Sequence, residues 1–374
     1  MDAGKTPSRV LKTVFLLLVS ISLLCGMTGG LLRAGVNVPL AGSALLGQAA
    51  LMHATLMICG FLGTVISIER AVAIKQKFAF LAPLSSGLAG ALILHGQAHI
   101  GAWMLVLSAS VFVGVNIVVV KRQPVAHTAL LLISALAWLT GNIGLVLNQS
   151  STQVFAWWFA FLVLTIAAER LEMTRLMRHR PGAQGMLFTL VAVLLAGAAL
   201  SGAWPIMGAA LFGTALCLLA VWLGIFDIAR RTISAHGLSR YMAVCLLSGY
   251  AWLGVAGIAW TATSMGLPAA RDTALHALGL GFIISMVMGH APVILPAVAG
   301  IKLQFGPHFY LPLGLLHSSV VLRLVFGFFA PQWRALAVTF NAVAIVTFAA
   351  TVITSAVMWH RSTAMAPSRS RRRG

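Results

Sequence analysis

Twelve long apolar runs, separated by short polar segments, take up most of this 374-residue chain. Each run is near the length of about 20 residues that a helix needs to cross a bilayer. Charged residues make up only 8% of the chain, against roughly 25% in soluble domains, so they are too few to cover a water-facing surface. The sequence therefore predicts an all-α polytopic membrane protein and excludes a soluble enzyme. The predicted spans are residues 14–32, 47–68, 78–95, 99–120, 126–147, 153–168, 185–203, 206–226, 241–261, 273–294, 309–330 and 335–358.

The basic residues predict how these spans are oriented. If the N-terminus is inside, 21 of the 25 Lys and Arg residues fall on the inner side, and Arg33, Arg271 and Arg334 fall outside. Cytoplasmic loops collect Lys and Arg, so we expect both termini in the cytoplasm and a multi-pass protein of a bacterial-type inner membrane. The basic tail, residues 361–374, would lie near anionic lipid headgroups. This placement explains the net charge of +19 without nucleic acid.

The chain is expected to form one transmembrane domain, residues 1–374, with no soluble domain. Span 2 ends in Glu69 and Arg70, and span 6 ends in Glu169 and Arg170. An offset of four spans is typical of a bundle of three four-helix units. The alternative is that an interfacial ion pair arose twice by chance.

Histidine is the ionisable residue that the sequence places inside spans, while the acidic residues fall at ends or in loops. Ionisable groups at membrane depth are costly and are therefore candidates for function. At a rise of 1.5 Å per residue, His53 in span 2 and His276 in span 10 lie roughly 9 and 5 Å from the outer end. Two imidazoles at one level can ligate a haem iron from opposite faces or share a copper ion. The alternative is that each ring bonds a neighbouring helix.

On each of the two spans, helical periodicity places further residues on the same face as the candidate histidine. At about 100° per residue, the stripe in span 2 contains His53, Met57, Gly60 and Thr64. Gly60 would leave the space that a flat macrocycle needs. The corresponding face of span 10 contains His276, Gly279, Ile283 and His290.

Five further residues are weaker candidates. His95 and His99 are four residues apart at an outer hairpin and are candidate metal ligands, provided that the turn is helical. His290 precedes Pro292 and Pro296, which we expect to break the inner end of span 10; it is a candidate metal ligand or a snorkelling side chain. His317, a further candidate metal ligand, and Arg323 lie in span 11. Arg323 would need a partner, such as a haem propionate or backbone carbonyls.

The histidines on spans 2 and 10 resemble those of haem-copper oxidase subunit I, in which these spans supply the axial ligands of a low-spin haem. That resemblance implies a fold of three four-helix units. Span 6, however, has no histidine and neither does span 7, so the copper ligands of the oxidase centre are missing.

A closer resemblance is to the NnrS family, haem- and copper-containing membrane proteins linked to nitric oxide metabolism. Residues 53–57 (His-Ala-Thr-Leu-Met) resemble its His-Ala-His-Glu-Met segment. Residues 276–290, from His-Ala-Leu to Gly-His, and the Leu-Arg-Leu of residues 322–324 resemble later segments. The resemblance implies a b-type haem held by His53 and His276. Thr55 and Leu56 replace the second histidine and the glutamate, which argues against copper.

The sequence therefore favours a haem protein of nitric oxide or redox chemistry near the outer leaflet, acting with a redox partner or respiratory subunit. Whether it is an enzyme stays open. One alternative is a cofactor-free permease of a small molecule that uses His95, His99 and Arg323. Another is an assembly or signalling partner without catalysis of its own.

Overall fold

The computed structural model describes residues 9–174, 181–267 and 269–364. Within these ranges every regular element is a helix, and twelve helical spans are long and apolar enough to cross a membrane. The prediction of an all-α polytopic membrane protein is thus confirmed. Lys5, four residues of the loop after span 6 (Arg175, Arg178, His179 and Arg180) and residues 365–374 of the basic tail lie outside the described residues.

The first six spans are formed by these helices: α1 (Arg9–Arg33), α3 (His53–Thr55) continued by η1 (Leu56–Gly63) and α4 (Thr64–Ile74), η2 (Lys77–Phe80) with α5 (Leu81–Leu94), α6 (Ala98–Arg122), α7 (Ala126–Val146) and α8 (Ser151–Thr174). A short helix, α2 (Ala44–Leu51), precedes span 2.

The last six spans are formed by these helices: α9 (Ala183–Leu200), α10 (Pro205–Phe226), α12 (Gly237–Thr263), α13 (Ala270–His276) continued by η3 (Ala277–Ile284) and α14 (Ser285–Ala299), η4 (Pro307–Phe309) with α15 (Tyr310–Phe329), and α16 (Arg334–Ala364). Two short elements, α11 (Ala229–Thr232) and η5 (Pro331–Trp333), lie in the connections.

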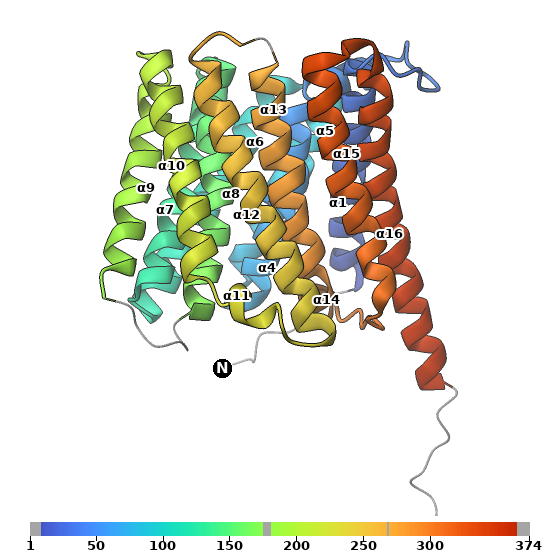
Figure 1. The fold of residues 1–374 in the computed structure, drawn as a ribbon. Coiled ribbons are helices and arrows are strands. Elements are labelled where there is room, and N and C mark those ends of the chain that lie inside the picture. The colour runs from blue at the N-terminus through green and yellow to red at the C-terminus, as the bar shows by residue number, and fades with distance from the viewer. Residues whose placement is uncertain (1–8, 175–180, 268, 365–374) are drawn as a thin grey trace, which may run out of the picture.

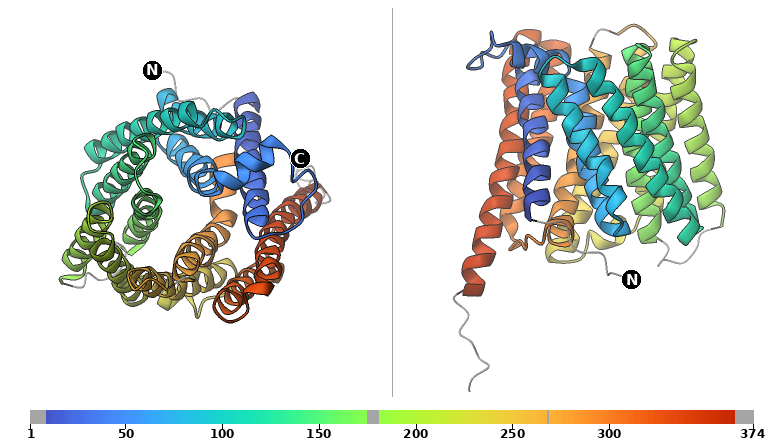
Figure 2. Two further views of the ribbon diagram at one scale, coloured as in Figure 1. Left: turned by 90° about the horizontal axis from the view of Figure 1, so that it is seen from above. Right: turned by 180° about the vertical axis from the view of Figure 1, so that it is seen from behind.

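Every fourth span lies toward the inside of the bundle. Span 6, helix α8, is the most buried of the twelve and contacts η3 of span 10, while α14 of span 10 contacts α4 of span 2. The other spans follow one another around this centre, and α1 packs against α16 to close the ring (Figure 2). This arrangement is the one expected of three four-helix units.

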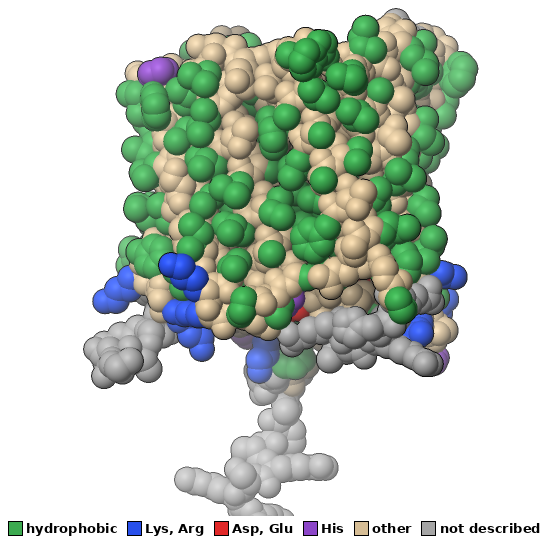
Figure 3. Space-filling view, turned by 90° about the vertical axis from the view of Figure 1, so that its left-hand side faces the viewer, with side chains coloured by type: hydrophobic (Ala, Val, Ile, Leu, Met, Phe, Trp, Pro, Cys, Tyr) green, Lys and Arg blue, Asp and Glu red, His purple; other side chains and the backbone are tan. Residues whose placement is uncertain are grey.

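The surface of the bundle is sorted by side-chain type. In Figure 3 a broad hydrophobic band is bounded at one end by Lys and Arg side chains. Both α1, at its start, and α16, at its end, reach this basic end (Figure 1). We call it the inner end, because basic residues collect on the cytoplasmic side of membrane proteins.

Span 2 begins later than the apolar run 47–68 indicated. Ser43 caps α2 by accepting a hydrogen bond from the Leu46 backbone N–H at 3.4 Å, and α2 ends at Leu51. His53 is therefore the first residue of the spanning helix, not a residue six positions below its end. The span then continues to Ile74 at the inner side.

The inner end of span 10 was expected to break at its prolines, and this expectation is wrong. Helix α14 continues through Pro292 and Pro296 to Ala299, and Gly300 ends it in a left-handed conformation with φ +74°. Proline in a membrane helix leaves backbone groups without their usual hydrogen bonds. Such a helix is tolerated where neighbouring helices, side chains or ordered waters supply other hydrogen-bond partners for these groups.

Candidate functional site

A cavity of about 430 Å³ lies at the outer end of the bundle, between spans 1, 2, 6, 10, 11 and 12. Its volume is in the range of roughly 300–1,000 Å³ typical of ligand pockets. His53 and His276 both line it, so the structure brings together the two histidines that the sequence paired. Most of the remaining wall is apolar, with Met57, Phe159 and Leu280 among its residues.

His53 is held by helix α1. Its Nδ1 lies 2.6 Å from the backbone oxygen of Gly26, and a carbonyl can only accept, so Nδ1 carries the proton and Nε2 keeps its lone pair. Gly30 makes room for the ring, because a Cβ at this position would lie 2.8 Å from Cε1 of His53. The sequence thus places a glycine where the imidazole meets the neighbouring helix.

His276 is held by its own helix in a similar way. Its Nδ1 donates to the backbone oxygen of Asp272 at 2.9 Å, and Oδ1 of the same aspartate lies 3.3 Å from Nδ1. No described residue forms a hydrogen bond with Nε2 of His276 or of His53. In the neutral form of each ring, the proton is therefore on Nδ1, which is held by an oxygen acceptor, and Nε2 has the lone pair that can bind a metal.

A π-helical segment of eight residues follows each histidine, η1 after His53 and η3 after His276. Such segments are rare and occur frequently at functional sites. Because a π-helix closes i→i+5 hydrogen bonds, side chains recur on one face every four to five residues. On span 2 the residues that line the cavity are accordingly His53, Ala54, Met57, Ile58 and Leu62.

This winding corrects the predicted stripe. Met57 faces the cavity as expected, but Gly60 packs against α1 and α5, where its Cβ would meet Ser22 at 2.9 Å and Gly90 at 3.8 Å. Gly60 therefore leaves no space for a ligand. The α-helical period of 100° per residue fails here because the π-helix turns less at each residue.

The same shift occurs on span 10. Gly279 faces the cavity, and a Cβ there would meet only Phe159, at 4.0 Å, so this glycine provides the open space that Gly60 does not. Ile284 replaces the expected Ile283 on the cavity wall.

Three arginines, Arg33, Arg323 and Arg334, also line the cavity. Arg323 is buried and has protein partners: Nε and Nη2 donate to the two carboxylate oxygens of Asp272 at 3.0 and 2.9 Å, and Nη1 donates to Asn341 at 3.3 Å. Arg334 donates to the same carboxylate at 2.9 Å. In the structure Arg323 thus pairs with Asp272 and Asn341 and not with backbone carbonyls, while a propionate partner stays a prediction.

The other candidate histidines lie outside the cavity. His95 and His99 are exposed at the outer end, and Nε2 of His99 accepts a hydrogen bond from Trp103 at 3.2 Å. His317 accepts a hydrogen bond at Nδ1 from Trp252 at 2.8 Å, and the two rings stack. His290 donates to the backbone oxygen of Met286 at 2.7 Å on α14. The structure therefore does not gather these four with His53 and His276.

Two aspartates were missed as site or core residues by sequence reasoning, which placed them at span ends or in loops. Asp272 joins His276, Arg323 and Arg334 in one network. The spacing of four residues between Asp272 and His276 on one helix was the signal that could have found it.

Asp227, the second of these aspartates, is 2% exposed and lies at the inner end of the bundle. Its carboxylate accepts hydrogen bonds from Arg170 at 2.6 and 3.1 Å and from Tyr250 at 3.0 Å.

Among the described residues no group of three or more His, Cys, Asp or Glu side chains has the geometry to hold a metal ion. The cavity instead offers two imidazoles, a donor set that suits an iron already held by four macrocycle nitrogens.

The fold and the cavity define a class: a twelve-span helical membrane protein with paired histidines in an apolar cavity near one membrane face. The chain belongs to the family described as a domain of unknown function, DUF8744, whose model matches residues 12–357. No curated protein matches the sequence.

Proposed function

We propose that this protein is a haem-binding membrane protein in which Nε2 of His53 and Nε2 of His276 are the axial ligands. The observation that carries the proposal is that two imidazoles from distant spans line one cavity, each with Nδ1 on a carbonyl and Nε2 unbonded. Imidazole nitrogens are common axial ligands of haem iron, and a hydrogen bond at the other ring nitrogen fixes the orientation of such a ligand.

The cavity wall also suits this group. Met57, Leu62 and Phe159 offer apolar and aromatic contacts for a macrocycle. Arg33 and Arg334 are more exposed than Arg323, and within the described residues each donates only one hydrogen bond, to the Ala50 backbone oxygen and to Asp272. Their remaining N–H groups offer cationic donors for propionates. Gly279 leaves an open stretch of wall beside His276.

Asp272 has a positioning role in this proposal. Its carboxylate and backbone oxygens both lie at Nδ1 of His276, so they fix the ring and raise the basicity of the opposite nitrogen. Arg323 and Arg334 hold the carboxylate in turn. The network spans three helical elements and would keep the ligand in place while charge changes nearby.

A bound haem would supply one-electron and diatomic-gas chemistry. The likeness of residues 53–57 and 276–290 to NnrS segments favours a role in the nitric oxide response or in electron transfer, in a bacterial-type inner membrane. A copper ion is not part of this proposal. The permease alternative relied on His95, His99 and Arg323, and the two histidines lie outside the cavity that Arg323 lines.

The test is the optical spectrum of the purified protein, oxidised and then reduced with dithionite, with an iron assay on the same sample. We expect about one iron per chain and a sharp reduced α band, as two strong axial nitrogen ligands produce in a b-type haem protein. His53→Ala and His276→Ala should each lose the band. His95→Ala and His99→Ala are matched controls, because these rings are exposed outside the cavity, and should keep it.

Two results would overturn the proposal. One is a His53→Ala protein with full haem content and an unchanged spectrum. The other is a folded wild-type protein that stays colourless and iron-free when expressed with added haem; substrate flux in liposomes would then support the permease instead.

A further inference from the structure

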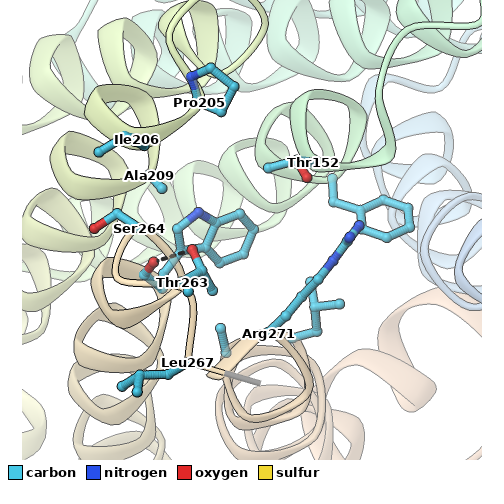
Figure 4. A pocket seen from close by; sticks show the side chains of 13 residues that line it. Thr152, Pro205, Ile206, Ala209, Thr263, Ser264, Leu267 and Arg271 are labelled. Carbon is cyan, nitrogen blue, oxygen red and sulfur yellow. Dashed lines mark hydrogen bonds between the residues drawn. The ribbon is translucent and has the colours of Figure 1, made fainter. Parts of the chain in front are cut away.

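A second cavity, of about 320 Å³, lies at the outer ends of α8, α10, α12 and α13 (Figure 4). Phe155 and Leu275 line both this cavity and the one with the two histidines. The two cavities are therefore neighbours separated by these side chains. Nothing in the proposed haem site uses the second cavity.

Its walls suit an apolar body. Trp260 forms one side, is 4% exposed, and packs with its ring centroid 4.6 Å from that of Phe212. Ile206 and Leu267 also line the cavity and are exposed on the outer surface of the bundle. Both side chains lie at or beyond the outer ends of their helices, so an amphiphile at this end of the bundle can reach the cavity.

Arg271 supplies a cation at the same place. Its Nη2 donates to Ser151 at 2.6 Å, and its guanidinium carbon lies 5.8 Å from the ring centroid of Phe155, so the side chain is held along one wall. Figure 4 shows Arg271 extending toward Thr152. Its remaining N–H groups have no hydrogen bond to a described residue.

The charge of Arg271 is not neutralised in the cavity, because none of the described residues that line it is Asp or Glu. The next residue, Asp272, lines the other cavity and is bound there to Arg323 and Arg334. The hydroxyl groups of Thr263 and Ser264 already donate to backbone oxygens, each at 2.6 Å. Arg271 is thus the charged hydrogen-bond donor that is available to a ligand in this cavity.

We infer that this second cavity binds an amphiphilic anion, with a carboxylate or phosphate head on Arg271 and an apolar body against Trp260. An arginine held on an aromatic ring and without a carboxylate partner in the cavity is suited to bidentate recognition of such heads. A free fatty carboxylate and an anionic phospholipid share this chemistry.

Bromine quenches tryptophan fluorescence on contact, so brominated amphiphiles report binding at Trp260. Full-length protein in nanodiscs would be titrated with 9,10-dibromostearate, with brominated phosphatidylglycerol, and with the neutral brominated stearyl alcohol. The signal of interest is the quenching lost in Trp260→Phe. Quenching by the free acid identifies a fatty carboxylate as ligand, and quenching by the phospholipid identifies a lipid head; either supports the inference.

Arg271→Gln should weaken binding of the anionic probe about tenfold, the effect of losing one charge-assisted interaction, and leave binding of the alcohol unchanged. Arg33→Gln, which removes an outer arginine that lines only the other cavity, should bind as the wild type does. Ala209→Phe, which places a large side chain in the cavity and keeps Arg271, should abolish binding of all probes.

The inference is overturned if no probe gives quenching that depends on Trp260, or if Arg271→Gln binds the anionic probe as tightly as the wild type. Haem content, measured on the same samples, does not enter this result. A negative result in the quenching experiment therefore does not contradict the proposed haem site. Likewise, absence of haem from the protein does not contradict the binding of an amphiphilic anion in the second cavity.

Discussion

Asp272 and His276 lie one helical turn apart on α13, and the aspartate places two oxygens at the histidine's Nδ1, the backbone oxygen at 2.9 Å and Oδ1 at 3.3 Å. The same carboxylate binds Arg323 and Arg334. A carboxylate behind a metal-binding histidine makes the ligand more basic and adds negative charge near the metal. Both effects favour the more positive, oxidised state of an iron.

On the proposed haem site, Asp272→Asn is therefore expected to raise the midpoint potential of the haem while the haem stays bound. The amide keeps the shape and an oxygen near Nδ1 but loses the charge, so the oxidised state loses more stabilisation than the reduced state. A spectroscopic redox titration measures the shift. Asp272→Glu, which retains the charge, is the matched control and should lie nearer the wild type. An unchanged potential in Asp272→Asn would show that the carboxylate does not act on the iron.

Gly30→Ala is expected to displace the ring of His53 and reduce haem content, since the new Cβ would lie 2.8 Å from Cε1. Contacts this short force a neighbour to move, and the ring is tied to Gly26 on the same helix. The measurement is haem per chain in purified protein. Gly47→Ala is the control, because nothing lies within 4 Å of its Cβ position, and it should retain the haem. Equal haem content in both variants would contradict the assigned role of Gly30.

The buried pair Arg170 and Asp227 predicts a strong stability effect. Arg170→Met leaves Asp227, 2% exposed, without its cation, and breaking a buried pair costs about 3–5 kcal/mol. Arg334→Met is the comparison: its side chain is 46% exposed, so its loss should cost no more than about 1 kcal/mol. Thermal unfolding in detergent measures both. Similar midpoints for the two variants would contradict the prediction.

The number of spans, the placement of His53 and His276 at one site, and the grouping of the spans by four could be predicted, because they depend on composition and on spacing along the chain. Apolar length sets where a helix crosses a bilayer whatever it packs against. The start of span 2 could not be predicted, because nothing in the run 47–68 signals that α2 ends at Leu51 and that the spanning helix begins after Met52.

Local winding limited the prediction of the site. Gly60 was assigned to the cavity on the period of an α-helix, and nothing in the sequence signals that residues 56–63 wind as a π-helix. The choice of hydrogen-bond partner was the second limit. Arg323 was expected to need a partner, but its pairing with Asp272 depends on how α13 packs against α15. Both depend on tertiary contacts, which one sequence does not display.

Gly257 tests how closely α10 and α12 must approach. A Cβ there would lie 2.6 Å from the backbone oxygen of Gly213 and 2.7 Å from the backbone nitrogen of Cys217, so the two helices would have to separate. Small residues permit such approach in membrane bundles, and overpacking costs about 1–3 kcal/mol. Gly257→Ala should lower the unfolding midpoint by a corresponding amount. Gly224→Ala on α10 has nothing within 4 Å and should be neutral or stabilising, since alanine is favoured over glycine in helices by about 1 kcal/mol. If Gly257→Ala were as stable as Gly224→Ala, the close backbone contact between α10 and α12 would not be a source of stability.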